Sequence, residues 1–347
     1  WRRPRPPPAL VWGPAALVAA AMLLPLGYLV VRTAGAGGEV WDLVFRARTL
    51  EILGRTVLLM VTVTAGSIAL AVPLAFLTVR TDLPGRRIWS ILTALPLVIP
   101  SYVGAFVAVA ALGPRGMFQQ ALEPLGVERL PEIYGFPGAA ITLTLLSYPY
   151  VLLTVRGALF RMDPALEETS RSLGMGPQAT FRRVVLPQLR PAMAAGGLLV
   201  ALYTLSDFGA VSLLRYETFT WAIYLQYGTG ARAVAAGLSL LLVALAGTVL
   251  AAEVGTRGKA RYYRLGGVSR APATVPLGRW RWPGAVLCGL VVLFGLVMPV
   301  FVLAYWLGQG LLAGEPLRLV WSAAWNSASI AALAAGAAVM AAVPVAI

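Results

Sequence analysis

The stretch "DPALEETSRSLGMGPQATFRRVVLPQLRP" (residues 163–191) is far more polar than the long apolar runs on either side of it. Over all 347 residues the chain is 59% hydrophobic and only 12% charged, a composition too apolar for a soluble domain. Since backbone groups must be paired inside a bilayer, the apolar runs predict helices of about 20 residues. We therefore predict an all-α, polytopic transmembrane helix bundle. Eight candidate spans cover residues 9–31, 54–79, 88–112, 137–160, 193–214, 233–252, 284–307 and 326–347.

The net charge of +14 reflects an uneven distribution of basic residues about these spans. With the N-terminus in the cytoplasm, 19 of the 28 Lys and Arg residues fall on the cytoplasmic side. Such an excess is the usual signature of membrane topology. It favours a lipid bilayer over nucleic acid as the partner of this chain, and it places the polar segment (residues 161–191) in the cytoplasm.

Two classes of site are excluded by composition. The chain has no His, which rules out a His-based metal centre and a Ser-His-Asp triad. Cys288 is the single cysteine, so no intrachain disulfide forms.

Two parts of the chain resemble each other. "RTVLLMVTVTAGSIALAVPLA" (55–75) aligns without gaps to "NSASIAALAAGAAVMAAVPVA" (326–346), and "MLLPLGYLV" (22–30) resembles "GLVMPVFVL" (295–303) at nearly the same shift. This order predicts a six-helix unit over residues 1–256, a cytoplasmic linker over 257–283 and the first two helices of a second, truncated unit over 284–347. We therefore expect the chain to be part of a longer protein.

The polar segment carries start and stop signals for two short helices. Asp163 followed by Pro164 predicts a helix start, because Asp accepts bonds from free N–H groups and Pro suits the first helical position. Gly174 predicts the end of that helix through a left-handed cap. Gly176-Pro177 restarts a second helix, which Pro187 is expected to interrupt. The result is a glycine elbow that presents a surface of defined shape to the cytoplasm.

The spacing within this segment resembles the EAA loop of ABC importer permeases. Glu168-Thr169-Ser170 is followed by Gly174, and Val184-Val185-Leu186-Pro187 comes after nine intervening residues; Thr and Ser replace the usual two alanines. The resemblance implies that the segment docks on a separate ATPase and transmits its closure to the helices. The residues predicted to couple to the ATPase are Glu167, Glu168, Gly174, Leu186 and Pro187.

The resemblance also implies that ATP hydrolysis and substrate capture are carried out by other subunits. The chain has no P-loop, since its single lysine, Lys259, is followed by Ala260. We therefore expect no enzyme activity and no cofactor in this chain, with ATP and Mg²⁺ bound by two copies of an ABC ATPase. An external binding protein, periplasmic or lipid-anchored, is expected to dock on loops such as 113–137, which carries Glu123, Glu128 and Glu132. The location is a bacterial cytoplasmic membrane, multi-pass, with the N-terminus inside.

A carboxylate inside the fifth span marks a candidate path through the membrane. Asp207 lies away from both ends of that span, and intramembrane acids are by default functional candidates. The alternative is that Asp207 pairs with a Ser or Tyr of a neighbouring helix for packing alone. Prolines in the third and fourth spans free further carbonyls near hydroxyl side chains. The predicted path residues are Asp207, Tyr203, Ser206, Ser101, Tyr102 and Tyr148.

"LPLVIPSYVGAF" (95–106) and "SDFGAVSLLRYETFTWAIY" (206–224) resemble ferric-iron importer permeases, in which two permease units are fused. Ferric iron prefers oxygen ligands, and a permease should hold its cargo weakly, so we expect no high-affinity metal site and at most a transient contact at Asp207. Thiamine, polyamine, sulfate and phosphonate remain alternative substrates. A different class, an ion-gradient-driven secondary transporter, would have Asp207 as its one clear acidic site. A membrane enzyme is disfavoured because no catalytic carboxylate pair lies at a membrane face.

Overall fold

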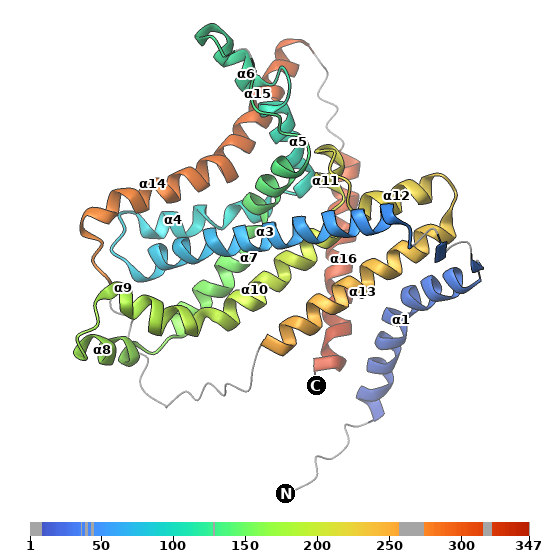
Figure 1. Cartoon of the computed structure of the whole chain (residues 1–347), viewed down its shortest axis with the longest axis horizontal. Coiled ribbons are helices and arrows are strands. Elements are labelled where there is room, and N and C mark those ends of the chain that lie inside the picture. The colour runs from blue at the N-terminus through green and yellow to red at the C-terminus, as the bar shows by residue number, and fades with distance from the viewer. Residues whose placement is uncertain are drawn as a thin grey trace, which may run out of the picture.

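The computed structural model describes residues 9–35, 37–38, 41–42, 45–127, 129–256, 274–314 and 321–346. Within these ranges it contains eight helical segments long and apolar enough to cross a membrane. The prediction of an all-α transmembrane bundle is confirmed (Figure 1).

The long helices run nearly the full width of a bilayer. They are α1 (Ala9–Ala34), α3 (Ala47–Arg80), α7 (Phe136–Arg161), α10 (Leu186–Ser206), α13 (Arg232–Thr256) and α16 (Trp321–Ala346). The shorter elements are α4 (Arg86–Leu92), η1 (Leu95–Val98), α5 (Ser101–Leu112), α6 (Met117–Leu122), η2 (Glu123–Leu125), α8 (Pro164–Ser172), α9 (Pro177–Thr180), η3 (Phe181–Val185), α11 (Gly209–Leu213), α12 (Phe219–Gly228), η4 (Gly278–Trp280), α14 (Arg281–Val292), η5 (Leu293–Val297) and α15 (Met298–Leu312).

The core lies where α3, α7 and α10 pack against one another. Leu74, Leu143 and Leu189, one from each helix, are buried in it. Small residues bring the helices close together, as expected where lipid supplies little hydrophobic driving force. A Cβ added at Gly196 of α10 would lie 2.7 Å from the Cα of Val151 in α7, so the two backbones touch at this point.

The expected third span (88–112) is broken in two. Helix α4 ends at Leu92, a short 3₁₀ turn follows, and α5 begins only at Ser101. Pro100 explains the break, because it lacks an N–H and forces the preceding Ile99 into an extended conformation. The crossing segment here starts at Ser101 instead of residue 88.

The fifth span also differs from the prediction of residues 193–214. It runs from Pro177 to Ser206 as one continuous helical segment of α9, η3 and α10. The predicted interruption at Pro187 is therefore wrong. Pro187 cannot donate a backbone hydrogen bond. The five-residue π-helix Phe181–Val185 just before it changes the hydrogen-bond pattern, so that the helix continues past the proline.

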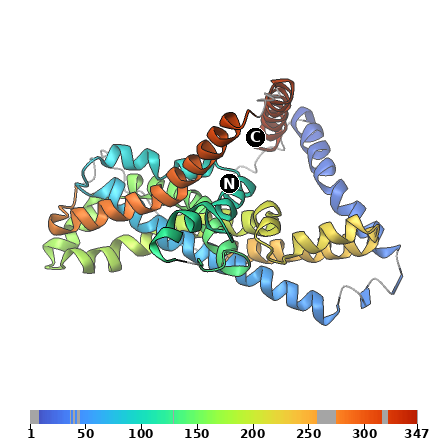
Figure 2. The same cartoon turned by 90° about the horizontal axis from the view of Figure 1, so that it is seen from above.

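The seventh crossing segment (α14, η5 and α15) packs on the first six helices. Cys288 is fully buried in the core formed by α3, α7 and α10, and Val302 packs with Val107 and Ala111 of α5. In contrast, the membrane-spanning windows of α1 and α16 have no buried residues. Helix α1 contacts α13 and α16 (Figures 1 and 2). The proposed division into two repeated units stays a prediction.

Most of the predicted linker, residues 257–273, lies outside the described residues. The part that follows is held against the turn between α3 and α4. The Val275 N–H donates to the Arg80 carbonyl at 2.8 Å, and the Leu277 N–H donates to Asp82 Oδ1 at 2.8 Å. Arg281 adds an ion pair to the same Asp82 carboxylate. The end of the linker is therefore docked on the turn between α3 and α4.

Candidate functional site

The polar segment folds into the first short helix, α8, and the glycine elbow that its sequence predicts, but its second helix is not short and continues without a break into α10. Asp163 Oδ1 accepts a hydrogen bond from the Ala165 N–H at 3.0 Å and so caps α8. Gly174 ends this helix in a left-handed conformation, with φ of 80°. The Met175 N–H then donates back to the Ser170 carbonyl at 3.2 Å, closing the turn. The elbow is set by this local chemistry.

The sides of α8 that face away from the bundle are open to solvent. Leu166 and Leu173 are exposed, with exposures of 50% and 74%, and Glu168 is exposed on the opposite side of the helix. The two leucines are seven residues apart and therefore lie on one side of the helix. Sequence reasoning did not identify them as contact residues, although exposed leucines at this spacing are a usable signal of a docking face.

Glu167 points the other way, into the protein. It is only 8% exposed, and its carboxylate accepts a hydrogen bond of 2.5 Å from the Arg80 guanidinium, which is 2% exposed. Arg171 lies 3.8 Å from the second carboxylate oxygen. The ion pair joins the last residue of α3 to the first turn of α8, so Glu167 links the polar segment to the bundle instead of facing a cytoplasmic partner. Arg80 could not be identified as that partner from the sequence.

The second helix of the polar segment is attached to the first helix and to α3. The Ser170 and Thr180 hydroxyls are 3.0 Å apart, and both side chains are buried. The ring of Phe181 packs edge-on against Phe76 of α3 at 5.0 Å between centroids. The second helix is therefore in contact with both α8 and α3, and it continues into α10. Leu186 and Pro187 are half-buried at the start of α10.

The second candidate site lies at a break after α10. The sequence predicted Asp207 inside a continuous helix, but α10 ends at Ser206 and Asp207 is extended, with ψ of 129°. Its Oδ1 accepts hydrogen bonds from the N–H groups of Ala210 at 2.9 Å and Val211 at 3.3 Å, capping α11. The side chain is 7% exposed. The cost of a buried carboxylate is thus offset by two backbone donors.

Other predicted path residues gather around this break. Ser101, the first residue of α5, lies near the Asp207 carboxylate and the Tyr203 hydroxyl. Tyr102 lies beside the break as well, because a Cβ added at Gly209 would be 2.7 Å from the Tyr102 Cβ. Tyr102 is 57% exposed, and Ser206 is exposed too. The breaks before α5 and after α10 therefore face each other.

Tyr148 is not part of this group. It is completely buried in the core, and its hydroxyl donates to the Thr93 carbonyl at 2.5 Å. That carbonyl lies between α4 and η1, where the break near Pro100 leaves backbone groups without regular helical partners. In this structure Tyr148 supports the break and lines no open surface.

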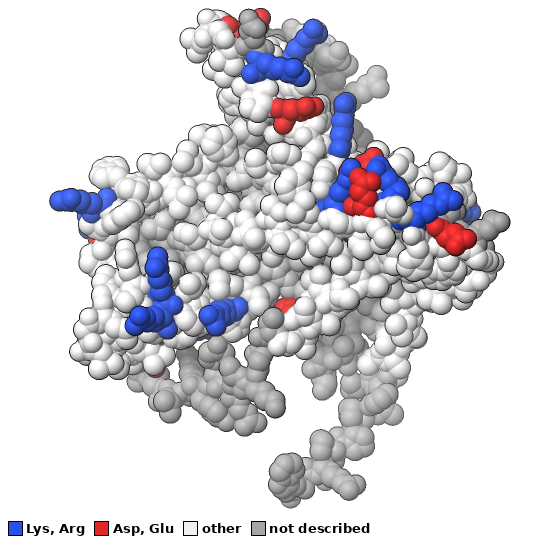
Figure 3. All heavy atoms as spheres, in the orientation of Figure 1, with Lys and Arg blue, Asp and Glu red and all other residues white. Residues whose placement is uncertain are grey.

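A compact group of charges lies where the start of α3 meets the segment before α12. Arg55 forms ion pairs with Glu51 at 2.5 Å and with Glu217 at 3.2 Å, and Arg48 pairs with both carboxylates. Figure 3 shows these adjoining basic and acidic side chains on the surface. In the predicted docking loop, Glu123 and Glu132 are exposed, while Glu128 lies outside the described residues. Among those described, no group of three or more His, Cys, Asp or Glu residues is arranged to hold a metal ion.

Comparison with protein families accounts for this arrangement. Residues 67–257 match the family described as "Binding-protein-dependent transport system inner membrane component". The chain belongs to this family of inner-membrane permease components. The permease is therefore a multi-pass protein of the inner membrane.

Individual relatives agree with the family. The permease is 34% identical over 98% of its length to the Fe(3+)-transport system permease protein FbpB 2 of Haemophilus influenzae, and it spans 65% of that relative. It is 29% identical, over 55% of its length and 68% of the relative, to the sulfate transport system permease protein CysT of Salmonella typhimurium. Among solved structures, a bacterial alginate ABC transporter in complex with a periplasmic protein superposes with a TM-score of 0.53 at 17% identity. That match covers 73% of this chain and 94% of the other.

Proposed function

We propose that this chain is the permease part of an ATP-driven importer for ferric iron. The observation that supports ferric iron most directly is the 34% identity to a Fe(3+)-transport permease over nearly the whole chain. Sulfate is the second candidate, supported by the likeness to a sulfate permease over about half of the chain. Substrate affinity would reside mainly in an external binding protein, because the family is described as binding-protein-dependent.

The proposed mechanism is alternating access driven by two copies of a separate ABC ATPase. The ATPase would bind ATP and Mg²⁺ and contact α8 through the exposed side chains of Leu166, Glu168 and Leu173. Its closure would move α8, and the ion pair between Glu167 and Arg80 would carry that movement to α3. In this orientation the N-terminus and the polar segment are both cytoplasmic.

The proposed path passes the two facing helix breaks. Ser101, Tyr102, Tyr203, Ser206 and Asp207 offer hydroxyl and carboxylate oxygens, which a hard ferric ion prefers. Because Asp207 Oδ1 is occupied by two N–H groups, a ferric ion would meet this carboxylate only in passing. Weak contact suits a permease, which has to release its cargo.

The test is uptake of radiolabelled ferric iron by cells that lack the full-length gene. Wild-type protein should restore uptake, and radiolabelled sulfate uptake should be the same with and without the gene. Unchanged ferric uptake in the deletion, together with lost sulfate uptake, would replace iron by sulfate. ATP hydrolysis by the purified transporter that does not respond to the loaded external binding protein would contradict the importer mechanism itself.

A further inference from the structure

The end of α3 is held by two other parts of the chain at once. The Arg80 side chain pairs with Glu167 of α8, while the Arg80 carbonyl accepts a hydrogen bond from the Val275 N–H of the linker at 2.8 Å. Two positions later, Asp82 pairs with Arg281, the first residue of α14. One short turn therefore joins the polar segment to the seventh crossing segment.

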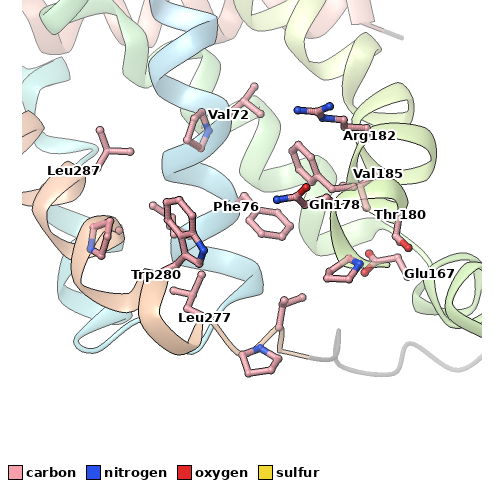
Figure 4. A pocket seen from close by; sticks show the side chains of 18 of the residues that line it. Val72, Phe76, Glu167, Gln178, Thr180, Arg182, Val185, Leu277, Trp280 and Leu287 are labelled. Atoms are coloured by element: carbon pink, nitrogen blue, oxygen red, sulfur yellow. The ribbon is translucent and has the colours of Figure 1, made fainter. Parts of the chain in front are cut away.

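Away from this turn, a groove of about 710 Å³ separates the polar segment from the linker and the start of α14. Figure 4 shows Trp280 on one side of Phe76 and Thr180 on the other. Among the described residues, no hydrogen bond or ion pair crosses the groove directly. The polar contacts of both walls meet instead at the end of α3.

The seventh crossing segment leads from this turn to the broken third span. At its start, a Cβ added at Gly284 would lie 3.0 Å from Leu77 Cδ2, so α14 packs closely on the last turns of α3. In η5, a Cβ added at Gly295 would lie 3.2 Å from the Cγ of Pro96 in η1, and Val302 of α15 packs on α5. Closely packed helices shift together because their contacts leave little free space.

We propose that Asp82 and Arg281 are positioning residues that couple the polar segment to the candidate path through α14 and η5. This inference rests on the proposed function as an ATP-driven importer. Displacement of α8 would move the turn that follows Arg80, and α14 would follow because it is attached there. Helix η5 would then shift η1, and with it Ser101 beside Asp207. If α3 alone carries the movement, the Asp82–Arg281 pair contributes nothing to transport.

The first test measures radiolabelled ferric iron taken up per ATP hydrolysed, using the complete transporter in proteoliposomes with its loaded binding protein. Asp82→Asn and Arg281→Gln should each lower this ratio about threefold or more, a typical effect on coupling between sites. Their melting temperatures should stay near the wild-type value, because a partly exposed pair adds little stability. The double variant should be no worse than either single variant, since both remove one link. Arg279→Gln is the control, because Arg279 is exposed and outside the pair.

A second pair of variants tests the contact with the break. Gly295→Val should press η5 against Pro96 and lower the same ratio, whereas Gly308→Val in α15 should keep it, because nothing lies within 4 Å of the added Cβ. Wild-type ratios in Asp82→Asn and Arg281→Gln, or additive losses in the double variant, would overturn the proposal. Equal ratios in Gly295→Val and Gly308→Val would overturn the route through η5.

A third measurement needs no transported substrate and therefore separates this proposal from the choice of ferric iron. Spin labels on Gln178→Cys and Trp280→Cys, both exposed positions, report the distance across the groove, and the buried Cys288 stays unlabelled. The distance should be the same with and without ATP and vanadate in the otherwise wild-type transporter, because both walls move with the end of α3. In Arg281→Gln it should change when nucleotide binds. A nucleotide-dependent distance in the wild-type background, or a constant one in Arg281→Gln, would overturn the proposal.

Discussion

The Arg80 guanidinium donates to the Glu167 carboxylate at 2.5 Å, across 87 positions of the chain and away from solvent. Breaking a buried pair by removing one partner leaves the other charge uncompensated, which typically costs about 3–5 kcal/mol. Two adjacent glutamates in α8 therefore have different roles. Glu167 attaches α8 to the end of α3, whereas the exposed Glu168 is available to contact another subunit.

Glu167→Gln is expected to lower the free energy of unfolding by about 3 kcal/mol or more, because Arg80 keeps its charge in a buried site. Glu168→Gln is the control and should change stability by about 0.5 kcal/mol or less, since its side chain is exposed. Thermal unfolding of the detergent-purified protein measures both. Similar melting temperatures for the two variants would show that the buried pair contributes little.

The elbow at Gly174 should tolerate only residues that accept a left-handed backbone. Gly174→Val places a β-branched residue at φ of 80°, at a cost of about 1–2 kcal/mol, although nothing lies within 4 Å of the added Cβ. We expect normal insertion into the membrane but loss of substrate-stimulated ATP hydrolysis in the reconstituted transporter. Gly174→Asn should retain most of that stimulation, because Asn adopts this conformation more readily. Full stimulation in Gly174→Val would remove the elbow from the coupling mechanism.

The neighbouring glycines of α10 should differ in tolerance. Gly196→Ala brings a Cβ to 2.5 Å from Thr154 Oγ1 and 2.7 Å from the Val151 Cα, and this overpacking should cost about 1–3 kcal/mol. Gly197→Ala meets only side-chain atoms at 3.4 Å and should leave stability unchanged or slightly higher, since Ala is the better helix former. Melting temperatures of the two variants give the comparison. Equal tolerance would mean that α7 and α10 separate easily.

Two substitutions at Asp207 separate capping from transport. Asp207→Asn keeps an oxygen for the Ala210 and Val211 N–H groups and should fold normally, whereas Asp207→Ala should lose about 1 kcal/mol with the cap. If transport requires the negative charge of Asp207, substrate uptake falls in both variants. Wild-type uptake by a normally folded Asp207→Asn protein would restrict Asp207 to capping.

The docked linker should detach in strong acid. The Arg281 guanidinium and the Leu277 N–H hold the pKa of Asp82 below its usual range. A carboxyl with a lowered folded-state pKa contributes stability above its unfolded pKa of about 3.9 and loses it as the pH falls through the folded value. Docking should therefore persist from neutral pH to about pH 4 and weaken below.

A fluorophore on Thr274→Cys reports this docking through its anisotropy. Labelling is selective because Cys288, the single native cysteine, is buried. Anisotropy should be constant from pH 7 to about pH 4 and fall below it in the otherwise wild-type protein. In Asp82→Asn it should be low throughout. A decline centred near neutral pH would assign the docking to another group.

Much of the candidate site could be predicted because its signals are local. The cap at Asp163, the turn at Gly174 and the restart after Gly176 depend on neighbouring backbone groups, and each is present in the structure. Predictions failed at two prolines, in opposite directions. The third span was predicted as continuous but breaks at Pro100, and the helix predicted to break at Pro187 continues past it through a π-helical turn.

The sequence by itself determined the membrane helices, the uneven distribution of positive charge about them and the elbow of the polar segment, because hydropathy, charge and capping act over a few residues. The tertiary structure decided that Glu167 turns inward to Arg80, that Asp207 caps α11, and that α14 packs on the first unit. These contacts depend on how distant helices pack. Two adjacent glutamates look alike in sequence, and only the position of Arg80 distinguishes them.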